Sequence, residues 1–135
     1  MHEWALAESI LAAAETTAAD QHLKSIMRIM VNLGELQNID RRILRFALKE
    51  LTRDRKKFSK ARFQFKTEKT TFSCTACGQR WSLADQKQKL EPAVAEAIHF
   101  IPEAVLSYVR CPHCKSPDFH ILTGRGVTLA TITGT

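Results

Sequence analysis

The sequence predicts an α+β fold in which two helices cover a three-stranded sheet and a four-cysteine, zinc-ribbon-like module is inserted. Three observations predict it. Apolar residues recur at helical spacing in two segments, and they alternate with polar residues in three others. Two Cys-x-x-Cys pairs, beginning at Cys74 and Cys111, lie between the second and third alternating segments. A chain of 135 residues is long enough for one small core and a metal-held module.

Residues 3–18 and 41–54 are the two expected helices. The residues at helical spacing are Trp4, Ala7, Leu11 and Ala14 in the first helix, and Leu44, Ala47, Leu48 and Leu51 in the second. Asp40 precedes the second helix and is a good N-cap, because its side chain can accept hydrogen bonds from the first backbone N–H groups. Two amphipathic helices therefore supply the cover of the sheet.

Three extended segments are expected to form the sheet. They cover residues 24–36, 61–72 and 119–132. Gly34 marks the end of the first segment, and the last is bent at Gly124-Arg125-Gly126. We therefore expect one domain of residues 1–72 plus 119–135, and a zinc-binding module of residues 73–118.

The four cysteines predict a structural zinc site. Two residues between paired cysteines let both sulfurs point into one turn, and four thiolates complete a tetrahedron around Zn(II) without an open position for substrate. Disulfides and a redox Cys-x-x-Cys are the alternatives, and the doubled motif argues against both. The expected ligands are Cys74, Cys77, Cys111 and Cys114. The segment between the pairs contains a helical pattern over about residues 90–109, which we expect to be a helical insertion.

The first residues, Met1-His2-Glu3, contain a possible nickel-binding sequence. The initiator methionine is normally kept when the second residue is bulky, so Met1 is expected to supply the free α-amine. That amine, the Met1–His2 peptide nitrogen and a ring nitrogen of His2 can close two adjacent chelate rings. Such a flat set of nitrogens is typical of Ni(II) or Cu(II) rather than Zn(II). Glu3 adds a carboxylate beside them, although a tripeptide alone is a weak signal.

His99 is a further candidate nickel ligand. It lies within the helical insertion, where a lone histidine on an apolar helix is usually a packed residue with a satisfied ring. It is also the histidine that an inserted element could bring to a distant site. We state as a hypothesis that it fills the fourth corner left by the three nitrogens at the chain terminus.

Charge is unevenly distributed along the chain. The formal net charge is +6, but residues 41–70 contain twelve bases against three acids, and residues 1–40 contain six acids against two bases. A solvated face is the usual meaning of a basic block, an acidic protein partner comes next, and nucleic acid stays open. No apolar run approaches the roughly 20 residues of a membrane span. We expect a cytoplasmic chain with no membrane partner.

In combination, Met1-His2-Glu3-Trp4, Leu33-Gly34-Glu35-Leu36 and the paired Cys-x-x-Cys motifs make the chain resemble the HypA/HybF family of hydrogenase nickel-incorporation proteins. The resemblance covers essentially the whole chain. The long segment between the cysteine pairs, with Ile98-His99-Phe100-Ile101-Pro102-Glu103, looks like the archaeal form.

The resemblance implies a nickel metallochaperone rather than an enzyme. Family members deliver Ni(II) with a nucleotide-hydrolysing HypB-type partner to the [NiFe] centre in the hydrogenase large subunit. Met1, His2 and Glu3 match the family's nickel site, and the four cysteines match its zinc site. Residues 1–72 plus 119–135 are then the nickel-binding domain. Self-association stays open. The main alternative is a basic zinc-ribbon protein that binds nucleic acid, although we expect no nucleic-acid partner.

Overall fold

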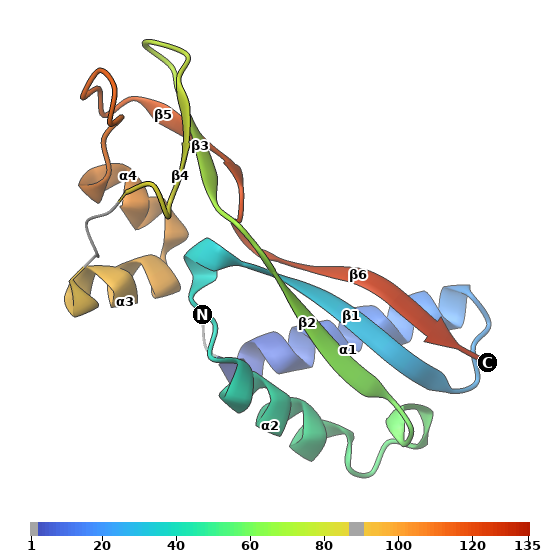
Figure 1. Ribbon diagram of the computed structural model, residues 1–135. Coiled ribbons are helices and arrows are strands. Elements are labelled where there is room, and N and C mark those ends of the chain that lie inside the picture. The colour runs from blue at the N-terminus through green and yellow to red at the C-terminus, as the bar shows by residue number, and fades with distance from the viewer. Residues whose placement is uncertain (1–2, 87–90) are drawn as a thin grey trace. The chain divides into compact units, whose positions relative to one another are not determined.

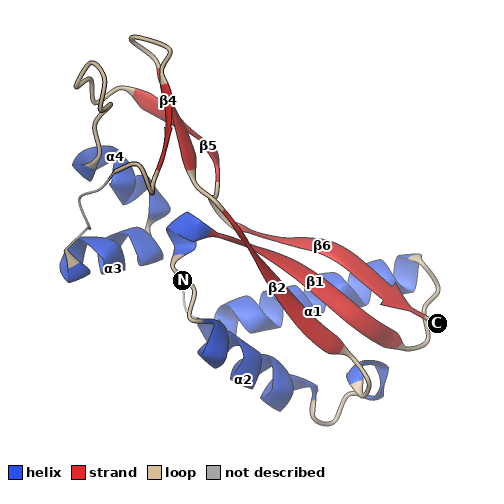
Figure 2. Cartoon of the chain, in the orientation of Figure 1, coloured by secondary structure: helices blue, strands red, loops and turns tan. Residues whose placement is uncertain are grey.

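The computed structural model describes residues 3–86 and 91–135, as six strands and several helical segments (Figures 1 and 2). The helices and 3-10 turns are α1 (Glu3–Asp20), η1 (Glu35–Gln37), α2 (Arg41–Thr52), η2 (Lys56–Phe58), α3 (Pro92–Phe100), η3 (Pro102–Ala104) and α4 (Val105–Tyr108). The strands are β1 (Ile26–Gly34), β2 (Arg62–Glu68), β3 (Thr71–Cys74), β4 (Arg80–Ser82), β5 (Phe119–Thr123) and β6 (Val127–Gly134).

The chain packs into two compact units. The first contains residues 1–32, 39–66 and 127–135, and the second contains residues 33–38 and 67–126. The second unit therefore takes in residues 33–38, 67–72 and 119–126, which the sequence analysis grouped with the first part of the chain. The assignment of nickel to one part and zinc to the other stays a prediction.

The first unit has the expected pair of helices on a three-stranded sheet. Its sheet has the strand order β2-β1-β6, so β2 is an edge strand. Helix α1 packs against α2 and against β6. The core is aliphatic, and its fully buried side chains include Leu11, Ile26, Ile29, Leu44 and Leu48.

Both helices begin close to where the sequence predicts. Asp40 is the N-cap of α2: its side-chain oxygen accepts hydrogen bonds from the backbone N–H groups of Arg42 and Ile43, at 3.0 and 3.2 Å. Trp4 differs from the prediction, since it was expected on the buried face of α1. Its side chain is 44% exposed, and its ring meets Phe46 edge to face with centroids 6.0 Å apart.

The second unit is built on a second three-stranded sheet, which the sequence analysis did not foresee. Its order is β4-β3-β5, with antiparallel pairing of β3 to both neighbours. The segment 61–72, expected as one strand, forms β2 and the first half of β3, which belong to different sheets. The segment 119–132 likewise divides into β5 and β6.

The hydrogen bonds at Thr70 explain the break between β2 and β3. The Thr70 N–H donates to the Glu35 carboxylate at 3.0 Å, and the Thr70 hydroxyl donates to the Gly124 carbonyl at 3.1 Å. Gly34 lies against the same Gly124 carbonyl, because a Cβ built at Gly34 would come within 2.4 Å of its oxygen. The break between β2 and β3 therefore depends on contacts between residues far apart in the sequence.

The helical insertion is shorter and more broken than expected. Helix α3 ends before Pro102, whose ring cannot continue an α-helix, and η3 and the short α4 follow. The beginning of the expected insertion, at residue 90, lies outside the described residues. Ile98, Val105 and Val109 of this region pack into the core of the second unit, so the insertion covers the sheet of the cysteine module.

Candidate metal centre

The four cysteine sulfurs come together in the second unit. All four Sγ atoms lie within 4.8 Å of one another, and two of the pairs, Cys74–Cys114 and Cys77–Cys111, are 3.5 and 3.7 Å apart. Sulfurs bound at about 2.3 Å to one tetrahedral zinc ion would stand about 3.8 Å from one another. The sulfur set therefore fits Zn(II), with four protein ligands and no position left for a substrate.

The two cysteine pairs have the same backbone design. In each, the N–H of the second cysteine points at the sulfur of the first, at 3.5 Å for both Cys77 to Cys74 and Cys114 to Cys111. The first cysteine of each pair also donates its N–H to the carbonyl five residues later, at Gln79 and Ser116 respectively, each at 2.9 Å. These short-range contacts build the same turn around each pair of thiolates.

The residue after each pair has a left-handed backbone. Gly78 has φ of 77° and donates its N–H to the Cys74 carbonyl at 2.9 Å. Lys115 has φ of 65° and makes the same bond to Cys111, also at 2.9 Å. Glycine adopts this conformation without steric cost, whereas lysine does not. The second turn therefore contains a strained residue that the first one avoids.

The thiols have divergent pKa values. Burial raises the pKa of Cys111, but the backbone N–H groups of Cys114 and His113 and the neighbouring thiols lower it to about 7. The Gln79 backbone lowers the pKa of Cys77, yet desolvation and the other three thiols outweigh this and raise it to about 12. Because zinc binds thiolates, it must displace the protons that such thiols hold at neutral pH. Zinc affinity is therefore expected to fall as the pH falls.

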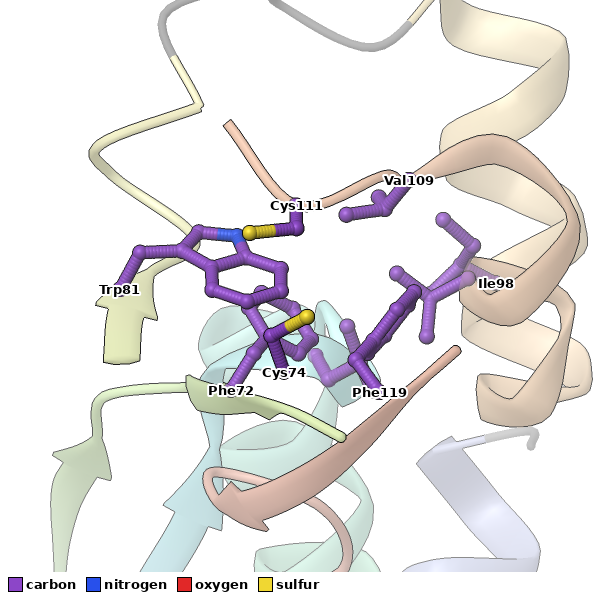
Figure 3. Close-up of a cluster of buried hydrophobic side chains, with 9 residues drawn as sticks. Phe72, Cys74, Trp81, Ile98, Val109, Cys111 and Phe119 are labelled. Atoms are coloured by element: carbon purple, nitrogen blue, oxygen red, sulfur yellow. The ribbon is translucent and has the colours of Figure 1, made fainter. Parts of the chain in front are cut away.

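The centre is part of the hydrophobic core of the second unit. Cys74 and Cys111 are buried beside three aromatic rings, those of Phe72, Trp81 and Phe119, whose centroids lie 5.2 to 5.5 Å apart (Figure 3). The indole Nε1 of Trp81 is buried and has no hydrogen-bond partner among the residues that the structure describes. Loss of the metal would leave unpaired thiols inside this cluster.

His113 and His120 are outside the sulfur group. The candidate group, searched over residues 3–86 and 91–135, contains the four cysteines alone. His113 lies between two ligand cysteines but is exposed, and His120 is exposed on β5. The set of four cysteines is therefore the ligand set that the geometry supports.

Among the predicted nickel residues, Glu3 and His99 can be placed, whereas Met1 and His2 lie outside the described residues. Glu3 is the first residue of α1, and its carboxylate Oε2 accepts a hydrogen bond from the Asp40 N–H at 3.0 Å. That contact links the start of α1 to the residue that caps α2. The residue that follows His2 is thus held by the fold of the first unit.

His99 is a buried histidine of α3 in the second unit. Its Nδ1 is hydrogen-bonded to the backbone carbonyl of Gln37. A carbonyl only accepts, so Nδ1 carries a proton, and in the neutral ring the lone pair is on Nε2. Metal-binding histidines are commonly oriented in this way by a backbone carbonyl.

The role of Gln37 is not evident from the sequence. Its side chain is 4% exposed, and its amide oxygen accepts the Gly126 N–H at 2.9 Å, so the residue is fixed on both sides. Nothing local in the sequence marks a glutamine after a strand as a support for a histidine some sixty positions away. Only the fold brings the two together.

Comparisons with known proteins agree over nearly the full chain. A family model described as "Hydrogenase/urease nickel incorporation, metallochaperone, hypA" matches residues 1–134. The hydrogenase maturation factor HypA of Pyrococcus abyssi is 42% identical over 132 residues, which cover 98% of this chain and 94% of the relative. The protein of the same name from Thermococcus sibiricus is 39% identical, with 98% and 95% covered.

A solved structure has a similar fold. The solution structure of the nickel metallochaperone HypA from Helicobacter pylori aligns with a TM-score of 0.64 and 20% identity, over 98% of this chain and 96% of that one. Within the described part of the chain, no helix is long and apolar enough to span a membrane.

Proposed function

Because the chain belongs to the HypA family of nickel-incorporation metallochaperones and hydrogenase maturation factors, we propose that it binds Ni(II) at its N-terminus and delivers it during maturation of [NiFe] hydrogenase. The observation that carries this proposal is the Met-His-Glu start leading directly into an ordered helix. Helix α1 begins at Glu3, and Glu3 is hydrogen-bonded to Asp40. A terminal chelate attached to a fixed helix end loses less conformational freedom on binding metal than one on a loose tail.

The proposed nickel ligands come first from Met1 and His2. The α-amine, the Met1–His2 peptide nitrogen and the His2 ring supply three nitrogens, which suit the planar geometry of Ni(II). Glu3 completes the sequence motif, and its carboxylate supports the site by its bond to Asp40. This arrangement requires Met1 to be the first residue of the mature chain, with its amine unmodified.

His99 is proposed as the fourth nickel ligand. The support comes from the hydrogen bond between Nδ1 and the Gln37 carbonyl, which sets the tautomer that offers Nε2 to a metal. Burial of the ring fits a ligand held in one orientation. A purely structural histidine would show the same two features, so nickel binding by His99 variants distinguishes the two roles.

The four-cysteine centre is proposed to hold zinc as a structural ion. The sulfur spacing and the absence of an open coordination position support this role. We propose that the chain does no covalent chemistry and that its function is to bind Ni(II) and then to release it. Its partners would be a HypB-type nucleotide-hydrolysing protein and the hydrogenase large subunit.

Nickel titration of two proteins that differ only at the terminal amine tests the terminal site. One has its native N-terminus, and in the other the Met1 α-amine is acetylated. Acetylation removes the amine from the chelate, so we expect loss of tight nickel binding with unchanged zinc content and circular dichroism. Equal nickel affinity in the two proteins would contradict the proposal. Mass spectrometry of the native protein provides the control that Met1 is present and unmodified.

Substitution of His99 tests the fourth ligand separately. His99→Ala is expected to weaken nickel binding and to change the nickel absorption spectrum. His99→Gln keeps a group that can donate toward the Gln37 carbonyl, and it serves as the matched control for packing. If both variants bind nickel with the affinity and spectrum of the parent protein, His99 is a structural residue only.

A further inference from the structure

We propose that a basic pocket between α2 and β2 binds an acidic peptide segment of a protein partner. The pocket lies wholly in the first unit and has a volume of about 580 Å³, within the range of about 300–1,000 Å³ typical of ligand pockets. Four cationic side chains line it, from Arg45, Lys49, Arg53 and Arg62, and none of the described residues that line it is acidic. This proposal is independent of nickel binding.

Most of this positive charge has no carboxylate partner among the residues that the structure describes. Arg53 pairs with Glu50 at 2.5 Å. Within residues 3–86 and 91–135, no carboxylate pairs with Arg45, Lys49 or Arg62. One base of the same block outside the pocket is neutralised, since Arg55 pairs with Glu15 at 3.0 Å. The pocket therefore brings together three bases that no carboxylate of the described residues neutralises.

The charges on α2 are arranged at a cost to the helix. Arg45 and Lys49 lie four residues apart on α2, and Arg53 follows four residues later as the C-cap, which places the three charges in one row. Like charges at this spacing repel each other and destabilise a helix slightly. A row that works against the helix yet borders a pocket is better explained by an anionic ligand than by solubility alone.

Arg45 is already held in position. Its Nη1 donates to the Phe63 carbonyl at 2.8 Å, and its guanidinium carbon lies 4.7 Å from the centroid of the Phe65 ring. A guanidinium has five N–H groups in a planar fork, so a single bond to a carbonyl leaves others for a carboxylate. Because the arginine is fixed before binding, the ligand does not bear the full cost of ordering it.

The pocket suits an acidic peptide better than a nucleic acid. Sites for single-stranded nucleic acid combine cations with exposed aromatic rings on which bases stack. The two rings that line the pocket, Phe58 and Phe63, are only 3% and 8% exposed, and Arg45 covers Phe65. The Phe63 carbonyl is occupied by Arg45, so the peptide would be recognised through its carboxylates rather than by pairing with the backbone there.

Two double charge-reversal variants distinguish peptide binding by the pocket from nonspecific attraction to the basic block. Lys49→Glu with Arg62→Glu changes two lining residues, whereas Lys60→Glu with Lys66→Glu changes two exposed lysines nearby that do not line the pocket. Both alter the net charge equally. Lys49→Glu also replaces repulsion by attraction toward Arg45 and Arg53, so the pocket variant is expected to melt no lower than the parent protein.

The probe is a short fluorescent peptide in which glutamate alternates with serine, measured by anisotropy at low salt. We expect the pocket variant to bind it roughly tenfold more weakly and the control variant to change by less than about threefold. Amide shifts of Lys49 and Gln64 should move on titration of the parent protein. The same peptide with glutamine in place of glutamate is expected not to bind.

Four results would overturn the proposal. They are equal weakening by both double variants, equal binding of the glutamine peptide, no binding of the glutamate peptide, and tighter binding of oligothymidylate than of the glutamate peptide. The last result would point instead to nucleic acid. A circular dichroism melt of each variant shows that it is folded, so a change in binding reports on the surface.

Discussion

The two compact units are stabilised by different means. The first has an aliphatic core between two helices and a sheet, with Leu11, Ile29, Leu44 and Leu48 fully buried. In the second, two cysteines of the metal centre are themselves core residues, packed with Phe72, Trp81 and Phe119. The cysteine centre is therefore inseparable from the hydrophobic core of the second unit, whereas the first unit contains no cysteine. Zinc should therefore matter to one unit and be nearly irrelevant to the other.

Zinc removal is expected to have the largest effect. Structural zinc contributes on the order of 10–16 kcal/mol in small zinc-binding peptides, so chelation should unfold the second unit. Each unit contains one tryptophan: Trp81 is buried in the second, and Trp4 is 44% exposed in the first. In a Trp4→Phe protein, chelation should shift the Trp81 emission strongly to the red. In a Trp81→Phe protein, the Trp4 emission should change little.

A strong change in the emission of both Trp4 and Trp81 on chelation would contradict the expectation that only the second unit depends on zinc. Circular dichroism gives a second readout, because the long helices α1 and α2 belong to the first unit. Most of the helical signal should survive chelation. Addition of zinc should restore the Trp81 emission.

Truncation of core side chains should have the next largest effect on stability and should also distinguish the two units. Phe72→Ala is expected to cost about 3–5 kcal/mol and Leu48→Ala about 2–5 kcal/mol, since both side chains are fully buried. Only Phe72→Ala should also weaken zinc binding, because Phe72 packs in the cluster that contains Cys74 and Cys111. Denaturant unfolding and competition with a zinc indicator measure the two effects. Equal zinc affinity in both variants would show that the aromatic cluster does not support the metal centre.

Substitutions after the cysteine pairs should have the smallest effects, with opposite signs. Gly78→Ala introduces a Cβ at φ of 77° and should destabilise the second unit by about 1 kcal/mol. Lys115→Gly relieves the same strain at φ of 65° and should stabilise it by about 0.5–1 kcal/mol. Nothing lies within 4 Å of a Cβ built at Gly78, so backbone strain alone is tested. Zinc-loaded thermal unfolding measures both, and changes of the same sign would contradict the account.

Features set by neighbouring residues could be predicted from the sequence. The Asp40 N-cap and the buried stripe of α2 follow from helical spacing, and the α+β class, with its pair of helices on a three-stranded sheet, was predicted correctly. The four cysteines could be predicted as one ligand set because each pair builds its own turn. The family resemblance read from the first residues and the cysteine spacing was also confirmed.

Features set by distant residues could not be predicted. The continuous pattern of residues 61–72 hides the change of sheet, because the bonds that cause it come from Glu35 and Gly124. The support of His99 by Gln37 likewise joins segments far apart in sequence. Trp4 was predicted to be a core residue because helical spacing shows which face of the helix a residue occupies. Spacing does not show whether other residues bury that face along its whole length.

The most direct test of two independent metal sites is to measure both metals in one variant. His2→Ala removes a proposed nickel ligand and leaves the cysteine centre unaltered. Protein loaded with both metals, passed through a desalting column and analysed by mass spectrometry for metal content, should retain about one zinc per chain and lose nickel. Retention of nickel at the parent level, or loss of nickel and zinc together, would contradict the account.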